Sequence, residues 1–250
     1  FLIDMQKQID KFGLIGKDIS YSFSKKFFSR KFINEGLNNC SYENYDISSI
    51  SKLLEVINDT KIKGLNVTIP YKESVIELLN HIDPIAKKIG AVNTIKIDKQ
   101  NKLLGYNTDY IGFKQSLESN ISNQKRALIL GTGGASKAIV YALKTLNIKT
   151  LLVSRKNREK CITYEDISNQ IIKDHTIIIN CTPLGTYPNI EECPKIPYKY
   201  ITERHLCYDL IYNPIKTKFL ILSEKEGASI INGNEMLENQ AIESWKIWNS

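Results

Sequence analysis

Four short polar segments in the first half of the chain carry the side chains best suited to chemistry: Ser20–Ser24, Asn66–Lys72, Ala91–Thr94 and Asn107–Asp109. Together they supply hydroxyls, amides, one lysine and one carboxylate. Such groups suit the carboxylate and alcohols of a small polyhydroxylated acid, and a lysine with a carboxylate forms a pair that can carry a proton. Each segment comes at or just after the end of a predicted strand, and strand ends line the binding crevice of open α/β sheets. The four segments therefore predict one binding site.

Each segment taken alone also has a purely structural interpretation. The serines of Ser20–Ser24 can satisfy local backbone groups in a turn, and Asn107–Asp109 can form an Asx turn or cap the next helix. Lys72 can be a surface lysine, and Asn93 can be a buried amide that closes a turn. The functional interpretation depends on all four segments occurring together.

A glycine-rich turn, Gly131–Ser136, follows a strongly apolar predicted strand at 126–131 and precedes a predicted helix. Glycine permits positive φ and lets a pyrophosphate approach the backbone closely. The N-terminus of the following helix offers N–H groups to the phosphates. This context predicts a dinucleotide site, and the alternative is a glycine-rich connection that binds nothing.

The segment after the next predicted strand decides which dinucleotide is expected. Domains that bind NAD place an acidic residue about 20 residues beyond the turn. Here the chain has Ser154, Arg155 and Lys156, and the first acid is Glu159. Because a guanidinium can grip a 2′-phosphate that a carboxylate would repel, the sequence predicts NADP, with Arg155 as the main contact. A solvated basic loop is the alternative.

Strands and helices alternate along the chain and predict an α/β fold with a mostly parallel sheet in each of two parts. In the first part we expect a helix through residues 73–79 and a hairpin around Asp98–Asn101. The predicted domains are 5–108 and 125–231, with a connecting helix and linker over 109–124. The last segment, 232–250, is amphipathic and predicted to be helical.

Composition excludes several classes of protein. The 250 residues are 42% hydrophobic and 24% charged, which is ordinary for a globular protein and excludes a disordered tail, a collagen-like repeat or a disulfide-stapled miniprotein. No stretch reaches the roughly 20 apolar residues of a membrane span, and charges interrupt the first apolar residues, so we expect no secretory signal.

The net charge and the spacing of the cysteines limit the kinds of partner and metal site that we expect. The net charge is +7, but the lysines are scattered and no nucleic-acid recognition motif occurs, so we expect no nucleic-acid partner. The five cysteines form no CxxC pair. We therefore expect reduced thiols, a cytoplasmic location and no metal site.

In this order, the segments resemble the shikimate dehydrogenase family. GLNVTIPYK, GAVNT and GYNTD are similar to its NVTxPxK, GAVNT and NTD signatures, and GTGGASKA is similar to its GxGGA cofactor turn. NCTPLGTYP, DLIYNPIKTKFL and GNEMLENQA resemble three later motifs of the family. The matches span residues 12–241, nearly the whole chain.

The resemblance implies NADP-dependent reduction of 3-dehydroshikimate to shikimate, on the route to chorismate and aromatic amino acids. It implies an N-terminal α/β substrate domain, a Rossmann-type NADP-binding domain and a C-terminal helix that packs back on the first domain. Lys72 and Asp109 would be the catalytic pair. The substrate-binding residues would be Ser22, Ser24, Thr68, Asn93, Tyr212 and Gln240. The cofactor-binding residues would be Gly131, Thr132, Gly133, Gly134, Ala135, Ser154, Arg155, Lys156, Thr182, Leu210 and Gly233.

The chain departs from the family pattern at Tyr21, Lys25 and Phe28, where the family usually has His, Pro and His. Ser154 precedes Arg155 where Asn-Arg is usual, and we still expect NADP because the arginine carries the phosphate contact. The open alternatives are a quinate or shikimate dehydrogenase that uses NAD, and a non-catalytic NADPH-binding regulator. A regulator would have no need of a lysine–carboxylate pair. We expect a small-molecule substrate, a monomer or homodimer and no membrane partner.

Overall fold

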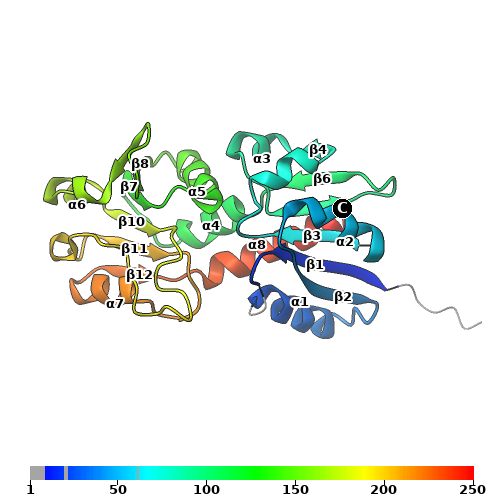
Figure 1. The fold of residues 1–250 in the computed structure, drawn as a ribbon. Helices are drawn as coiled ribbons and strands as arrows, with labels where there is room; N and C mark the ends of the chain where they lie inside the picture. Colours follow the sequence, from blue (N-terminus) through cyan, green and yellow to red (C-terminus); the bar gives the residue numbers. More distant parts are fainter. Residues whose placement is uncertain (1–8, 20–21, 61) are drawn as a thin grey trace, which may run out of the picture. The chain divides into compact units, whose positions relative to one another are not determined.

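The computed structural model describes residues 9–19, 22–60 and 62–250, and the chain folds into two compact units (Figure 1). The first unit comprises the described residues up to Thr108 together with Ala241–Ser250. The second unit comprises Asp109–Gln240. Tyr21, one of the departures from the family pattern, lies outside the described residues, as does Ser20.

The first unit is built on a six-stranded sheet with the order β2-β1-β3-β5-β6-β4. Its strands are β1 (Asp10–Gly16), β2 (Cys40–Asp46), β3 (Ile62–Val67), β4 (His81–Ile82), β5 (Thr94–Ile97) and β6 (Leu103–Tyr106). Its helices are α1 (Phe23–Asn34), α2 (Leu53–Thr60) and α3 (Pro84–Ile89), with 3-10 helices η1 (Ile50–Lys52) and η2 (Ser74–Leu78). β1 runs parallel to β2 and β3, whereas β5 is antiparallel to both β3 and β6. The β5–β6 pair confirms the predicted hairpin.

The helix predicted through residues 73–79 is confirmed over Ser74–Leu78, but it is a 3-10 helix and not an α-helix. This segment forms the 3-10 helix η2, which ends at Leu79 in an extended conformation. Asn80 then donates its backbone N–H to the carbonyl of Leu103. Hydrogen bonding to the sheet therefore ends the helix at this point. The local apolar pattern gives no sign of this long-range contact.

Each face of the first sheet is covered by helices, because alternate residues of a strand point to opposite sides. On one face, Leu65 packs with Leu53 and other residues of η1–α2, η2 and α3. On the other, Phe12 packs with Phe28 of α1 and with Trp248. The rings of Phe12 and Trp248 stack with centroids 5.0 Å apart.

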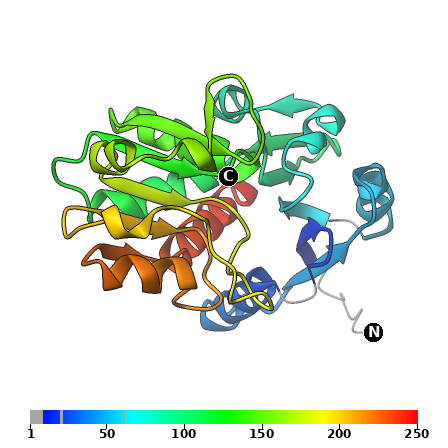
Figure 2. The same ribbon diagram turned by 60° about the vertical axis from the view of Figure 1, so that its left-hand side comes forward.

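Trp248 comes from the long C-terminal helix α8 (Asn234–Trp248), which is red in Figures 1 and 2. Its indole Nε1 donates to the carbonyl of Ile95 at 3.0 Å. The ring fills the space over Gly64, where an added Cβ would lie 2.3 Å from Trp248 Cδ1. The last residues of α8 are thus part of the first unit's core, which confirms the predicted return of the C-terminal helix.

The second unit is built on a six-stranded parallel sheet with the order β12-β11-β10-β7-β8-β9. Its strands are β7 (Arg126–Leu130), β8 (Lys149–Ser154), β9 (Cys161–Thr163), β10 (Ile177–Asn180), β11 (Leu206–Asp209) and β12 (Ser229–Ile231). Its helices are α4 (Asp109–Glu118), α5 (Gly134–Thr145), α6 (Asn169–Asp174) and α7 (Lys218–Lys225), with 3-10 helices η3 (Tyr164–Asp166) and η4 (Tyr198–Tyr200). The chain builds outward from β7 to β9 and then returns to place β10 beside β7. This reversal is the switch point at which Rossmann-type sheets bind ligands.

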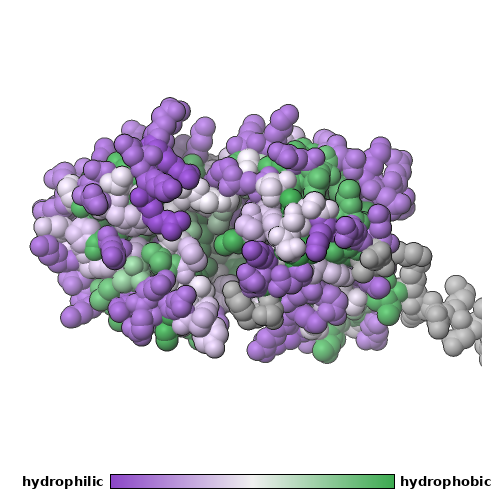
Figure 3. All heavy atoms as spheres, viewed as in Figure 1, coloured by the Kyte–Doolittle hydropathy of each residue, from purple (hydrophilic) through white to green (hydrophobic). Residues whose placement is uncertain are grey.

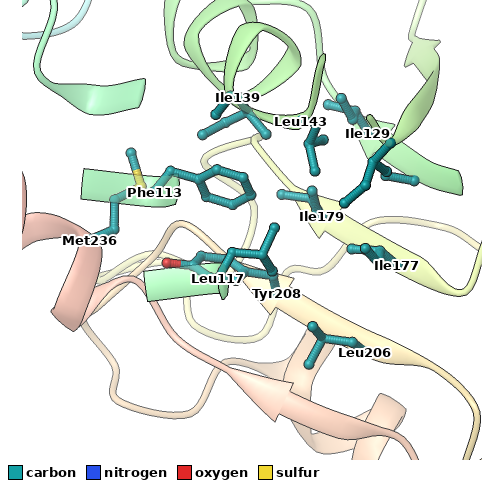
Figure 4. Packing of buried hydrophobic residues seen from close by; sticks show 13 residues of the cluster. Phe113, Leu117, Ile129, Ile139, Leu143, Ile177, Ile179, Leu206, Tyr208 and Met236 are labelled. Atoms are coloured by element: carbon teal, nitrogen blue, oxygen red, sulfur yellow. The ribbon is translucent and has the colours of Figure 1, made fainter. Parts of the chain in front are cut away.

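One face of the second sheet is covered by α4, α5 and the start of α8 (Figure 4). There Phe113, Ile139 and Met236 pack against Ile129 and Tyr208 of the sheet. The other face is covered by α6 and α7. The sequence sets 109–124 apart as a connecting segment, whereas in the structure α4 packs against α5 within the second unit.

On the face seen in Figure 3, hydrophilic side chains cover most of each unit, and hydrophobic ones are scattered between them. Within the described ranges, no helix has both the length and the apolar character needed to span a membrane.

Candidate active site

Thr68 and Lys72 lie in the loop that follows β3. The backbone N–H of Thr68 donates to the carbonyl of Ile15 at 3.0 Å. Gly16 permits this close approach, because an added Cβ there would lie 2.5 Å from Thr68 Cγ2. Further along the loop, the Lys72 carbonyl accepts a hydrogen bond from the N–H of Val92 at 2.7 Å. The second and third predicted polar segments are therefore joined directly.

Asn93 is 2% exposed and is held by both its backbone and its side chain. Its carbonyl accepts from Val67 N at 2.8 Å, and its N–H donates to the carbonyl of Tyr106 at 3.1 Å. Its Oδ1 accepts from Thr108 N at 2.7 Å, and its Nδ2 lies 3.0 Å from Thr108 Oγ1. Because a backbone N–H can only donate, the bond from Thr108 N shows that the carboxamide oxygen, and not its nitrogen, faces the backbone of Thr108.

Within the first unit, these contacts connect the backbone of Lys72 with the segment that carries Asn93 and with Thr108. Lys72 is hydrogen-bonded to Val92, the residue before Asn93, and Thr108, which is bonded to Asn93, is the residue before Asp109. Asp109 begins the second unit and is bonded directly to Thr108 in the chain, so its Cα lies about 3.8 Å from that of Thr108. Asp109 is the first residue of α4 and is 4% exposed.

The predicted serine pair lies at the start of α1. Ser22 is the N-cap, and its hydroxyl accepts from the N–H of Ser24 at 3.2 Å. Ser24 is buried close to Tyr42, whose hydroxyl donates to Asn66 Oδ1 at 2.8 Å. Asn66 Nδ2 in turn lies 3.4 Å from the carbonyl of Asn93. The serine pair thus lies near the polar contacts that run from Tyr42 through Asn66 to Asn93, and Ser22 also has the local capping role that a serine-rich turn predicts.

The glycine-rich turn joins β7 to α5. Gly131 has φ +109°, and an added Cβ would lie 3.1 Å from Thr182 Cγ2, so the loop after β10 lies directly against the turn. Gly133 is the N-cap of α5, which opens with Gly134 and Ala135. Within the described part of the chain, no side chain caps this end of the helix, and an added Cβ at Gly133 would meet no atom within 4 Å. The N–H groups of this first turn therefore suit a phosphate.

The basic segment after β8 folds back toward this turn. Ser154 is buried, and its hydroxyl accepts from the N–H of Lys156 at 3.3 Å. The side chains of Arg155 and Lys156 are exposed. Arg158 donates from Nη1 to Thr132 Oγ1 at 3.4 Å. The structure thus adds Arg158, which is not among the predicted cofactor residues, to the cations near the turn.

A buried polar network connects the ends of β10 and β11. Asp209 Oδ1 accepts from Asn180 Nδ2 at 3.1 Å, and Thr217 Oγ1 donates to Asp209 Oδ2 at 2.6 Å. Asn180 Oδ1 accepts from both the N–H and the hydroxyl of Thr182, at 3.0 and 2.6 Å. Burial raises the pKa of Asp209 to about 6, against the opposing effect of its hydrogen bonds. The network fixes the starts of two loops, which carry Thr182 and Tyr212.

The remaining predicted residues also lie in the second unit. Gly233 packs directly on Leu210, because an added Cβ would lie 2.1 Å from the Leu210 carbonyl oxygen. Tyr212 is half-buried in the loop after β11. Gln240 donates from Nε2 to the carbonyl of Leu237 at 2.9 Å, within α8. The structure therefore assigns Asp109, Tyr212 and Gln240 to the second unit, and the other predicted substrate and catalytic residues to the first.

Comparison with known proteins gives the family. A family model for the shikimate dehydrogenase substrate binding domain matches residues 14–95. A shikimate dehydrogenase (NADP(+)) from Clostridium beijerinckii is 41% identical over 95% of this chain and 91% of its own. The chain belongs to the shikimate dehydrogenase family.

Solved structures of shikimate dehydrogenases share its fold. Shikimate dehydrogenase 1 from Peptoclostridium difficile is 41% identical, with a TM-score of 0.86 over 96% of this chain and 92% of its own. Shikimate 5-dehydrogenase from Thermus thermophilus, in complex with NADP(H) and shikimate, is 26% identical, with a TM-score of 0.85 over 96% and 93%. An N-terminal α/β unit followed by a Rossmann-type unit is therefore confirmed.

The residues of the second unit are suited to bind NADP, the cofactor in the names of such shikimate dehydrogenases. Gly133 leaves room for a phosphate at the N-terminus of α5, and Arg155 and Lys156 extend from the end of β8. Among the described residues, no group of three or more His, Cys, Asp or Glu side chains is arranged to hold a metal ion.

Besides Arg158, the sequence-based prediction missed Ser244, which lies beside the residues that hold Asn93. Ser244 of α8 contacts the hydroxyl of Thr108 and the amide of Asn66. A serine on the buried side of an amphipathic helix has no local signal that distinguishes it from a core position. Only the long-range contacts identify it.

Proposed function

We propose that this chain catalyses the reversible, NADPH-dependent reduction of 3-dehydroshikimate to shikimate, in the pathway to chorismate and aromatic amino acids. NADPH bound at the glycine-rich turn supplies the hydride that reduces the ketone carbon. The ketone oxygen then takes up one proton and becomes the hydroxyl of shikimate. Two electrons and one proton from NADPH, with one further proton, balance the reaction.

Lys72 is the residue proposed to give that proton. Its ammonium acts as the general acid toward the ketone oxygen and, in the direction of oxidation, its amine acts as the base. Asp109 shares a hydrogen-bond network with Lys72 and the substrate hydroxyls and so fixes the direction of the ammonium. Two contacts support this assignment: the Lys72 carbonyl accepts from Val92 N, next to Asn93, and Asn93 Oδ1 accepts from Thr108 N, next to Asp109 in the chain.

The substrate carboxylate is proposed to bind Ser22 and Ser24, because both lie at the N-terminus of a 12-residue helix whose positive dipole end favours an anion. Thr68 and Asn93 are proposed to bind the ring hydroxyls, and their backbone contacts hold them at the ends of neighbouring strands. Contacts from Tyr212 and Gln240 stay predictions.

The cofactor residues are proposed as predicted from the sequence. Gly131–Ala135 hold the pyrophosphate, and Arg155, with Ser154 and Lys156, holds the 2′-phosphate. Thr182, Leu210 and Gly233 line the nicotinamide end. Supporting this, Gly131 lies against Thr182, and Gly233 lies against Leu210. The monomeric or dimeric state and the cytoplasmic location also stay predictions.

Steady-state kinetics with shikimate and quinate, each with NADP and NAD, test the function. The reaction is followed by the absorbance of the reduced nicotinamide. We expect the highest kcat/KM with shikimate and NADP. Equal or better use of NAD would refute the cofactor assignment, and no shikimate-dependent reduction of NADP would refute the enzyme and favour the binding-protein alternative.

A further inference from the structure

Ser244 is fully buried in the first unit, one helical turn before Trp248. Its hydroxyl contacts three side chains from three different strand ends. Asn66 Nδ2 lies at 2.9 Å, Thr94 Oγ1 at 2.8 Å and Thr108 Oγ1 at 3.1 Å.

The directions of these hydrogen bonds follow from the chemistry of the groups. An amide Nδ2 only donates, so Ser244 Oγ accepts from Asn66. The single hydrogen of Ser244 is then directed to Thr94 or Thr108. Both threonine hydroxyls are also within hydrogen-bond distance of Asn93 Oδ1, at 3.1 and 3.2 Å. Ser244 is therefore hydrogen-bonded to the two residues that contact the carboxamide of Asn93.

We propose that Ser244 is a positioning residue for substrate binding, which acts through Thr94 and Thr108 to hold the carboxamide of Asn93 in its productive direction. This proposal rests on the proposed function, in which Asn93 binds a ring hydroxyl. Ser244 itself is placed behind Asn93 and touches no substrate.

Removing the hydroxyl leaves the Asn66 amide and two threonine hydroxyls of a buried network short of one partner, because the methyl group of alanine neither donates nor accepts a hydrogen bond. The hydroxyls of Thr94 and Thr108 can then form other hydrogen bonds, and they no longer hold the carboxamide of Asn93 in one orientation. We expect Ser244→Ala to raise KM for shikimate about tenfold, the size of one buried hydrogen bond, with kcat and KM for NADP within about twofold of the wild type.

Ser223→Ala is the matched control. Ser223 is also fully buried on a helix, but its hydroxyl donates to the carbonyl of Phe219 in its own helix, in the second unit. We expect it to leave KM for shikimate unchanged. If Ser244→Ala does not fold, Ser244→Cys, which fills a similar volume with a weak hydrogen-bonding group, takes its place in the same measurements.

A double-mutant cycle separates positioning from general destabilisation. If Ser244 acts through Asn93, Ser244→Ala has no further effect on KM for shikimate in an Asn93→Ala background. Additive effects of the two substitutions would overturn the proposal, as would an unchanged KM in Ser244→Ala. A wild-type enzyme without shikimate-dependent NADP reduction would instead overturn the proposed function, so the two failures are distinguishable.

Discussion

Thr217 donates its hydroxyl hydrogen to the buried carboxylate of Asp209 at 2.6 Å, and so ties the N-cap of α7 to the end of β11. The same carboxylate accepts from Asn180 Nδ2 and from the N–H of Ile211. Three segments of the second unit therefore meet at one ionisable group. Its protonation state affects both the stability of the unit and the loops that start there.

We expect the contribution of Asp209 to stability to fall as pH rises. Burial raises the pKa of Asp209 to about 6, whereas an unfolded chain has about 3.9. The folded state thus holds the proton more tightly, so the contribution is complete below pH ~4 and is lost as pH rises through about 6. Between pH 4 and 7, the free energy of unfolding of the wild type minus that of Asp209→Asn falls by roughly 2 kcal/mol.

Urea denaturation followed by circular dichroism at several pH values measures this difference. Asp166→Asn is the control, because hydrogen bonds from Thr163 lower the pKa of the exposed Asp166. Its contribution is lost only as pH falls below the ordinary range of a carboxyl, so its difference is flat between pH 4 and 7. If the difference in free energy of unfolding for Asp209→Asn is also independent of pH in this range, the pKa of Asp209 is not raised in the folded protein.

Lys72→Ala tests the proton donor. We expect kcat to fall by about 10²–10⁴ with little change in KM for shikimate, because a positioned proton transfer is lost while the binding groups remain. Lys63→Ala is the control. Lys63 lies on β3 of the same unit and pairs with Asp10 at the surface. Near-normal turnover in Lys72→Ala, measured by steady-state kinetics, would remove Lys72 from the chemistry.

Ser22 allows capping and substrate binding to be separated. Ser22→Ala removes the N-cap of α1, so we expect a loss of about 1 kcal/mol in stability together with a higher KM for shikimate. Ser22→Asp keeps a good cap but places a negative charge beside the proposed carboxylate site. It should retain the thermal midpoint of the wild type and raise KM for shikimate more than Ser22→Ala does. The reverse order of KM values would place the carboxylate elsewhere.

Arg155→Ala tests the choice of cofactor. A charge-assisted hydrogen bond to the 2′-phosphate contributes about 1.5–3 kcal/mol. We therefore expect kcat/KM for NADP to fall by about 10–100-fold, with kcat/KM for NAD nearly unchanged. Arg126→Ala removes a cation at the opposite end of the same sheet, where Arg126 lies 3.6 Å from Asp174, and should change neither. Equal losses with both cofactors would contradict a 2′-phosphate contact.

Much of this organisation is predictable from the chain because it depends on residues close in sequence. The glycine-rich turn, the β5–β6 hairpin and the polar ends of strands carry local signals, and the rules of parallel sheets place such ends together. The short edge strands β9 and β12 have only three residues each and no distinct pattern.

Other features depend on residues far apart in sequence. The hydrogen bond between Asn66 and Ser244 joins residues 178 positions apart, and the bond between Asn180 and Asp209 joins neighbouring strands. The direction of Asn93 and the raised pKa of Asp209 arise from such contacts. Neither can be derived from the type of residue or its immediate neighbours.

Helix α8 begins in the second unit and ends in the first, and this has a consequence for synthesis on the ribosome. Residues up to Thr108 emerge early, but the indole that covers Gly64 and the hydroxyl that joins Asn66 to Thr108 belong to Trp248 and Ser244. The part of this sheet face that α8 covers therefore stays exposed, beside the part that α1 covers, while more than half of the polypeptide is translated. Chaperones that shield such surfaces would have their longest task here, and a truncation that removes Ser244 and Trp248 would harm the N-terminal unit.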